Sequence, residues 1–222
     1  MVAGVSSAFS NTAMIGIPLV FTAYGPRGDA PLLFLLSIHL PVMTIAATLM
    51  FERIEMAEAG HGRMPWGHFA RRVSLNIVRN PIAIGIAAGA LARWAGLSLD
   101  GPFGTIVREL ADTAVPCALF ALGMSLKRYG LRDHLGASSV IVVLKLVVMP
   151  AVVLVMARYV FGLPPVWTGV ATVVAGASTG VNAYLIASRA GAGVGLACNA
   201  ITLSTVAATL TTGFWLSLAG GG

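Results

Sequence analysis

The feature that most constrains this chain is a series of seven apolar windows, each long enough to cross a bilayer. A helix needs about 20 apolar residues to span roughly 30 Å of hydrocarbon, and its backbone groups must satisfy one another there. The windows lie near residues 2–24, 30–51, 78–98, 103–126, 135–160, 165–188 and 194–219. Because the mean hydropathy is +0.88 and only 10% of the residues are charged, a soluble domain is excluded. We predict an all-α integral membrane protein.

The basic residues between the windows predict how the chain is oriented. Lys and Arg in short loops are retained on the cytoplasmic side of a membrane. With the N-terminus inside, nine of them are cytoplasmic: Arg53, Arg63, Arg71, Arg72, Arg79, Lys127, Arg128, Arg132 and Arg189. Only Arg27, Arg93 and Arg158 are clearly outside. We therefore expect a multi-pass protein of the cell (inner) membrane, with a cytoplasmic loop over residues 53–77.

The first window contains an interruption that an ordinary spanning helix lacks. Pro18 has no amide hydrogen, Gly16 adds backbone freedom, and the side chains of Asn11 and Thr12 can bond to freed backbone groups. We expect the helix to break here, with a merely kinked helix as the alternative. Irregular backbone inside a bilayer persists where it is buried in protein or lines a wet cavity, as at the substrate sites of secondary transporters.

A related interruption lies in the sixth window, over residues 176–184, where small and hydroxyl-bearing residues surround Asn182. Paired interruptions in the two halves of a chain are typical of inverted-repeat transporters, whose broken helices cross near the bilayer midplane. We predict two crossing helices, with Gly16, Pro18 and Gly180 at the breaks. The predicted substrate-binding residues are Asn11, Thr12, Ser178, Thr179, Asn182 and Lys145.

Charged residues within the windows are further candidates for function. Lys145 stands near the middle of the fifth window, where a lysine costs about 2.5 to 3.5 kcal/mol on insertion scales. Its ammonium can attract an organic carboxylate or pair with Asp112. Asp112 follows Arg108 by four residues, and Pro116 frees its carbonyl. We interpret Asp112 and Lys145 as candidates for coupling to a proton or sodium, with a structural pair of Arg108 and Asp112 as the alternative.

Other polar and reactive residues favour packing roles. The last window carries a polar face at helical spacing, and contacts between helices explain it better than substrate does. This face is formed by Asn199, Thr202, Thr205, Thr209 and Thr212. Cys117 and Cys198 have neither disulfide nor metal-ligand spacing, so no metal and no cofactor are predicted. The basic residues are dispersed between apolar runs, which argues against a nucleic-acid partner.

Five stretches, in this order, resemble the auxin efflux carrier family, whose bacterial members include proteins assigned as malonate transporters. They are SNTAMIGIPL followed by AYG, RNPIAIGIAAG, LADTAVPCALFALGMSL, LKLVVMP and GASTGVNAYLIAS, and together they cover nearly the whole chain. The resemblance implies ten spans in two five-span inverted repeats, of which this chain lacks the first three spans. Residues 1–52 then end the first repeat, residues 53–77 are the cytoplasmic loop, and residues 78–222 form the second repeat.

The interrupted windows and the resemblance together predict a secondary transporter and not an enzyme. The resemblance implies that its substrate is a small organic anion, such as an auxin-like acid, malonate or a related carboxylate, moved by efflux or by ion coupling. The sequence contains no Walker A loop for ATP. A homo-oligomer is compatible with the pattern. The alternative functions are a seven-span receptor and a non-transporting interaction subunit.

The resemblance yields a prediction about the 222-residue chain by itself. If three spans that wall the first repeat are absent, the polar residues around Asn11 face lipid, which cannot satisfy them. We expect the purified chain to oligomerise or aggregate and its vesicles to show no substrate-specific flux. Size-exclusion chromatography with flux measurements checks this, and a monodisperse monomer that carries malonate would contradict it.

Overall fold

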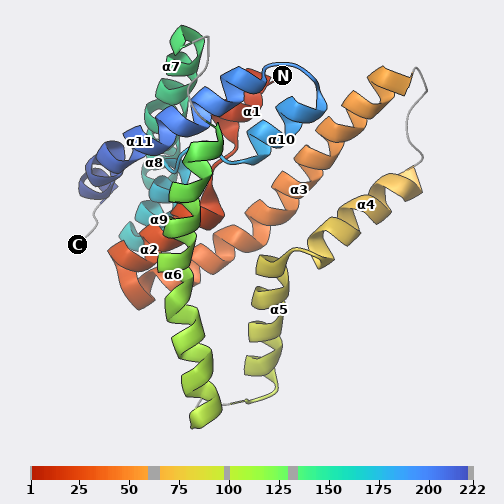
Figure 1. The fold of residues 1–222 in the computed structure, drawn as a ribbon. Helices are drawn as coiled ribbons and strands as arrows, with labels where there is room; N and C mark the ends of the chain where they lie inside the picture. The colour runs from red at the N-terminus through yellow and green to blue at the C-terminus, as the bar shows by residue number, and fades with distance from the viewer. Residues whose placement is uncertain (1, 60–65, 98–100, 130–134, 220–222) are drawn as a thin grey trace. The chain divides into compact units, whose positions relative to one another are not determined.

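The computed structural model describes residues 2–59, 66–97, 101–129 and 135–219 (Figure 1). These residues are helical apart from turns, short breaks and one isolated backbone bridge, so the prediction of an all-α chain is confirmed. They form two compact units. The first contains residues 1–32 and 117–222, and the second contains residues 33–116.

The first unit holds both interrupted windows. Its elements before the second unit are α1 (Val2–Ala8), the π-helical turn η1 (Thr12–Gly16), α2 (Ile17–Tyr24), the 3₁₀ turn η2 (Gly25–Gly28) and the first residues of α3 (Asp29–Ala59). It resumes in α6 (Pro102–Tyr129) and continues through α7 (Leu135–Val143), η3 (Leu144–Val148), α8 (Met149–Val155), η4 (Met156–Val160), α9 (Pro165–Ala175), α10 (Asn182–Arg189) and α11 (Val194–Ala219).

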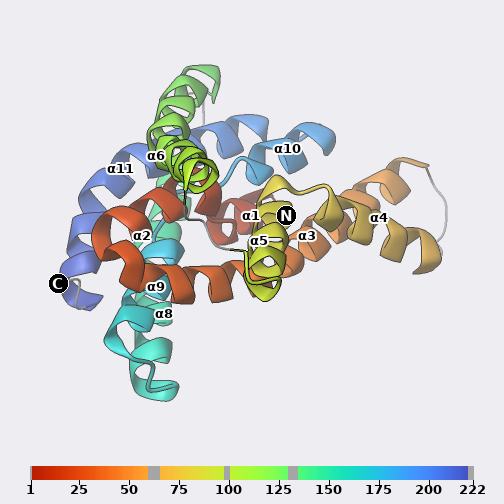
Figure 2. The ribbon, with the colours of Figure 1, turned by 90° about the horizontal axis from the view of Figure 1, so that it is seen from below.

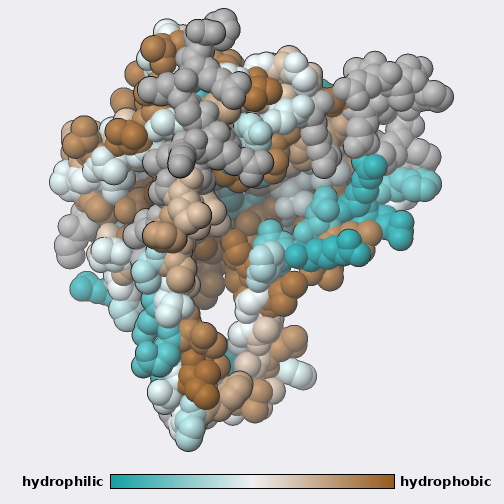
Figure 3. Space-filling model, in the orientation of Figure 1, coloured by the Kyte–Doolittle hydropathy of each residue, from teal (hydrophilic) through white to brown (hydrophobic). Residues whose placement is uncertain are grey.

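The second unit consists of most of α3, then α4 (Trp66–Val78), α5 (Pro81–Trp94) and the first half of α6. Helix α5 begins where Pro81 needs no amide hydrogen and the Asn80 side chain accepts from the amides of residues 82 and 83. Of the predicted loop at 53–77, residues 60–65 lie outside the described residues, residues 53–59 end α3, and residues 66–77 belong to α4. Helix α4 is amphipathic, since Phe69 and Val73 are buried whereas the residues between them are exposed. Figure 3 shows hydrophilic residues gathered over α4.

Fewer helices than seven meet the length and apolarity expected of a membrane span. Within the described residues three do, over Thr12–Phe51, Leu135–Val160 and Val194–Ala219, and a fourth is possible if the pair Gly67–Val78 and Pro81–Trp94, bent by 68°, crosses as one. The sixth window falls short because its break divides it into α9 and α10, whereas the first contributes the residues after its break to the span that begins at Thr12. Helix α6 is long, but Arg108, Glu109 and Asp112 lie within it.

The core of the first unit is built around α9 and α11. Helix α11 packs against α7 and α9. Helix α8 packs along α9 (Figure 2). Small and branched side chains allow this close approach: Val170, Ala197, Ala200 and Ile201 are all at most 1% exposed. The side chains that line the breaks are consequently held between packed helices.

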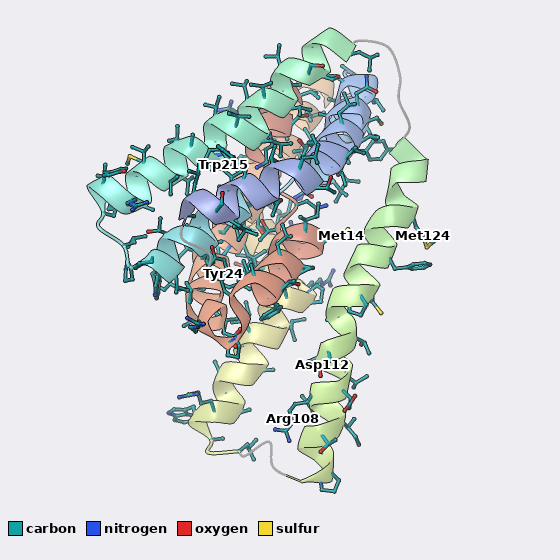
Figure 4. The ribbon with its side chains drawn as sticks, turned by 90° about the vertical axis from the view of Figure 1, so that its left-hand side faces the viewer. Met14, Tyr24, Arg108, Asp112, Met124 and Trp215 are labelled. Atoms are coloured by element: carbon teal, nitrogen blue, oxygen red, sulfur yellow. The ribbon has the colours of Figure 1, made fainter. Side chains whose placement is uncertain are left out.

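A proline in this core is accommodated by a tryptophan from another helix. Pro150 lacks the amide hydrogen that would bond to the carbonyl of Leu146, four residues earlier. The preceding turn, η3, is π-helical, and the indole nitrogen of Trp215 on α11 donates to the Leu146 carbonyl at 2.7 Å (Figure 4). The Leu146 carbonyl therefore has a hydrogen-bond partner on another helix, and this bond joins α11 to the segment around Pro150.

This contact predicts a stability difference between tryptophan variants. We expect Trp215→Phe to lower the free energy of unfolding by about 1 to 3 kcal/mol, because it leaves a buried carbonyl unpaired. Thermal unfolding of the detergent-purified chain measures the effect. The control is Trp94→Phe, because Trp94 is 86% exposed. Pro150→Ala restores the missing amide, which can then bond to the Leu146 carbonyl. In that background Trp215→Phe should lower the free energy of unfolding by less than it does in the native chain. If the losses in unfolding free energy of the two single variants simply add in the double variant, the explanation is wrong.

Candidate functional site

The first interrupted window breaks just before its glycine and proline. Helix α1 ends at Ala8, and the chain is non-helical until η1 begins at Thr12. The Asn11 side chain caps the new helix by accepting from the amide of Met14 at 3.3 Å. Gly16 and Pro18 follow the break, within η1 and the first turn of α2. The break therefore lies at the capping residue Asn11 and not at Pro18. Pro18 instead lies where the π-helical turn gives way to α-helix.

The second interrupted window breaks where its small residues lie. Helix α9 ends at Ala175 and α10 begins at Asn182, so Ser178, Thr179 and Gly180 are all in the non-helical stretch between them. Ser178 and Thr179 are completely buried. Since buried backbone groups need partners, this stretch has to find them outside its own helix.

The two breaks supply those partners to each other. Ser10 and Thr179 form an isolated antiparallel bridge. The amide of Asn11 donates to the carbonyl of Ser178 at 2.7 Å, and the amide of Gly180 donates to the carbonyl of Phe9 at 2.8 Å. The two interrupted segments therefore lie directly against each other. We call this arrangement, residues 9–11 with residues 178–180, the crossing.

Hydroxyl groups from neighbouring helices hold the crossing in place. The Thr179 hydroxyl donates to the carbonyl of Ser6 on α1 at 2.8 Å, and its amide donates to the hydroxyl of Ser204 on α11 at 2.9 Å. The Thr205 hydroxyl donates to that of Ser178 at 3.1 Å. The side chains of Ser178 and Thr179 are therefore engaged with protein groups.

The polar face predicted on the last window is only partly used in this way. Thr205 joins helices as expected, whereas the exposed Thr209 bonds to the carbonyl of Val206 in its own helix. Thr202 has a buried hydroxyl with no partner. Ser204 was missed, although its position beside Thr205 and its small hydroxyl side chain are the signal that could have indicated it.

Lys145 lies at the same crossing. It is completely buried, and its ammonium donates to the Ser10 hydroxyl at 2.8 Å and to the carbonyl of Ala175 at 2.5 Å, with the Met149 sulfur at 3.4 Å. All three partners are neutral groups of the first unit, so Asp112 is not among them. Ser10 was not selected as a site residue; the need of a buried ammonium for acceptors, together with its place beside Asn11, was the available signal.

The crossing also leaves one polar atom without a partner. The Asn11 side chain is 6% exposed, and its amide nitrogen has no hydrogen-bond partner although its oxygen caps η1. A buried donor of this kind is normally satisfied by protein, water or ligand. Thr12 beside it is also buried, whereas Asn182, the first residue of α10, is exposed. The arrangement can donate hydrogen bonds to an oxygen-bearing ligand next to the start of a helix.

The charged residues of α6 belong to a different environment. Arg108 and Asp112 are exposed side chains of the second unit, one turn apart on α6 (Figure 4), and no ion pair joins them in the described structure. Helix α6 continues through Pro116. The structural pair considered for these residues is therefore not formed. In the described residues no group of three or more His, Cys, Asp or Glu side chains could hold a metal.

The close approach at the crossing predicts that Gly180 cannot be enlarged. A Cβ added there would lie 3.0 Å from the backbone carbonyl oxygen of Ser10, and a backbone atom cannot rotate away. We expect Gly180→Ala to destabilise the chain by about 1 to 3 kcal/mol, the usual range for overpacking. Thermal unfolding in detergent measures this. The matched control is Gly213→Ala on α11, where a Cβ meets nothing within 4 Å. Equal melting temperatures for the two variants would contradict the packing.

Comparison with known proteins agrees with a transport role. The family described as "Membrane transport protein" matches residues 1–216. The "Putative malonate transporter" of Rhizobium meliloti (strain 1021) is 25% identical over 208 residues, which are 94% of this chain. The chain spans 63% of that relative's length. The match over residues 1–216 shows that the chain belongs to the membrane transport protein family, that of the auxin efflux carriers, and is not an enzyme.

Proposed function

We propose that this chain acts in secondary transport of small organic anions, of the class of malonate, a related carboxylate or an auxin-like acid. The observation that carries the proposal is the crossing, in which two interrupted helices pair backbone to backbone. Secondary transporters bind their substrates where such discontinuous helices meet. The name of the relative from Rhizobium meliloti supports malonate as the first substrate to test.

The proposed architecture is an inverted repeat, with residues 1–52 ending one repeat and residues 78–222 forming the other. Two features support it. Each break separates a short helix from the next, and each interrupted window precedes a long apolar helix, α3 in the first case and α11 in the second. In such a transporter one bundle rocks against another around a fixed site, so packing that holds the crossing rigid is expected.

The proposed substrate site lies at the helix starts that follow the breaks. Helix N-termini carry partial positive charge and favour anions. Asn11 and Thr12 stand at the start of η1, and Asn182 stands at the start of α10. The unpartnered amide nitrogen of Asn11 is a donor that a carboxylate oxygen can accept from. Ser178 and Thr179 have a supporting role in this proposal, because their hydroxyls already bind protein groups.

The proposal places the protein in the cell (inner) membrane, as a multi-pass carrier that works as a monomer or homo-oligomer. Its coupling ion would be a proton or sodium. Asp112 and Lys145 are the proposed charged residues for that step. Asp112 is exposed within the second unit and so is accessible to a proton, whereas Lys145 is enclosed at the crossing.

Two measurements test the function. Binding of radiolabelled malonate to the purified chain tests the site, since both interrupted segments are within it. Uptake and efflux in vesicles from cells that express the protein then separate a transporter from a receptor or interaction subunit. Binding with flux supports the proposal, whereas a ligand response without flux favours a receptor, and the absence of both would reject an anion site.

Asn11→Asp is the sharpest substitution for the proposed site. The carboxylate keeps an oxygen for the amide of Met14, but it replaces the unpartnered donor with negative charge. We expect the folded variant to bind malonate at least tenfold more weakly, since a like charge now faces the anion and a donor is lost, about 1.4 kcal/mol or more. Equilibrium binding with radiolabelled malonate measures this.

The control for Asn11→Asp is Asn76→Asp, which makes the same change on α4 of the second unit. Asn76 contacts the Thr48 hydroxyl at 3.5 Å and has no place in the proposed site. It should leave binding unchanged. If Asn11→Asp has the same melting temperature as the native chain and binds malonate with the same affinity, Asn11 does not contact the anion.

A further inference from the structure

The ammonium of Lys145 occupies the end of a broken helix. Helix α9 ends at Ala175, where the last carbonyls have no amide of a following turn to bond to. The carbonyls of Thr172 and Val174 are satisfied by the amides of Gly176 and Ala177 as the chain tightens. The carbonyl of Ala175 instead accepts from Lys145. A positive charge thus sits at the negative end of the helix dipole.

The same ammonium reaches the other interrupted segment. Its second oxygen partner is the hydroxyl of Ser10, whose backbone bridges to Thr179. A lysine ammonium has three hydrogens, and the described contacts are to the oxygens of Ser10 and Ala175 and the sulfur of Met149. Its donors are therefore used within the protein, and its complete burial leaves it no exposed surface for a substrate carboxylate.

These ligands are of the kind that binds a coupling cation. In transporters with broken helices, unwound backbone carbonyls and the C-terminal ends of half-helices coordinate Na⁺ or a proton. Here a carbonyl at the end of α9 and a hydroxyl in the other break surround a cation that is covalently attached to the chain. Hard cations also prefer such oxygen ligands.

We propose that Lys145 is a tethered cation that fills a cation position at the crossing, so that this position takes no Na⁺ from solution. Lys145 is then a positioning residue that joins α9 to the first break and not a ligand of the transported anion. The inference deepens the proposed function by identifying the cation of the same site, and it leaves Asp112 as the remaining candidate for ion coupling.

Two variants of different size test the proposal. Lys145→Ala removes the ammonium and vacates its volume, whereas Lys145→Met removes the charge but fills most of that volume. Both should lower the melting temperature of the purified chain in detergent by about 5 to 10 °C, since a charged hydrogen-bond pair is lost. Na⁺ or methylammonium should recover at least half of that loss in Lys145→Ala and none in Lys145→Met. Choline at the same concentration is the ionic-strength control.

The native chain provides a measurement that does not depend on either variant folding. Its melting temperature should be the same in sodium and choline salts, because the position is already filled. The proposal would be overturned if Na⁺ raised the melting temperature of the native chain in a saturable way and Lys145→Met showed the same Na⁺ binding. A folded Lys145→Ala variant that neither Na⁺ nor methylammonium stabilises would also overturn it. None of these readings involves a substrate, so failure of malonate binding would reject the proposed function and leave this inference standing.

Discussion

The structure of the first unit depends on one constraint, that backbone groups freed by a helix break must find partners inside the protein. Two breaks in one chain meet this constraint together. The amides of Asn11 and Gly180 donate across the crossing to the carbonyls of Ser178 and Phe9. Each unpaired group would cost several kcal/mol in an environment without water. Either break alone would be unstable, and the pair is stable because each completes the other.

The surrounding helices convert this pairing into a rigid site. Ser204 and Thr205 on α11 hold the second break, and Trp215 on the same helix bonds to the carbonyl that Pro150 leaves free. Lys145, one turn before that proline, joins the end of α9 to Ser10. Helix α11 and the kinked segment from α7 to α8 therefore act as a frame. Rocking of this frame as one body would carry the crossing with it, as a transport cycle needs.

The contacts at the crossing leave one buried hydrogen-bond donor unused, and this donor is what the proposed anion site requires. Most hydroxyls and the ammonium there are engaged with protein groups, whereas the Asn11 amide nitrogen is buried without a partner. A neutral donor beside a helix start can hold a carboxylate loosely enough to release it, which transport requires as much as binding. The proposed function relies on this division between residues whose polar groups build the crossing and the one residue with an unpartnered donor.

Much of the fold class and part of the candidate site could be predicted from the amino-acid sequence alone. Apolar windows determined a helical membrane protein, and hydroxyls, glycines and Asn11 within them indicated where backbone would be irregular, because those effects act over one helical turn. Ser10 and Ser204 were missed because their partners lie far away in the sequence: 135 residues separate Ser10 from Lys145. Only tertiary structure decides which acceptors a buried ammonium reaches, since that choice depends on how the helices pack.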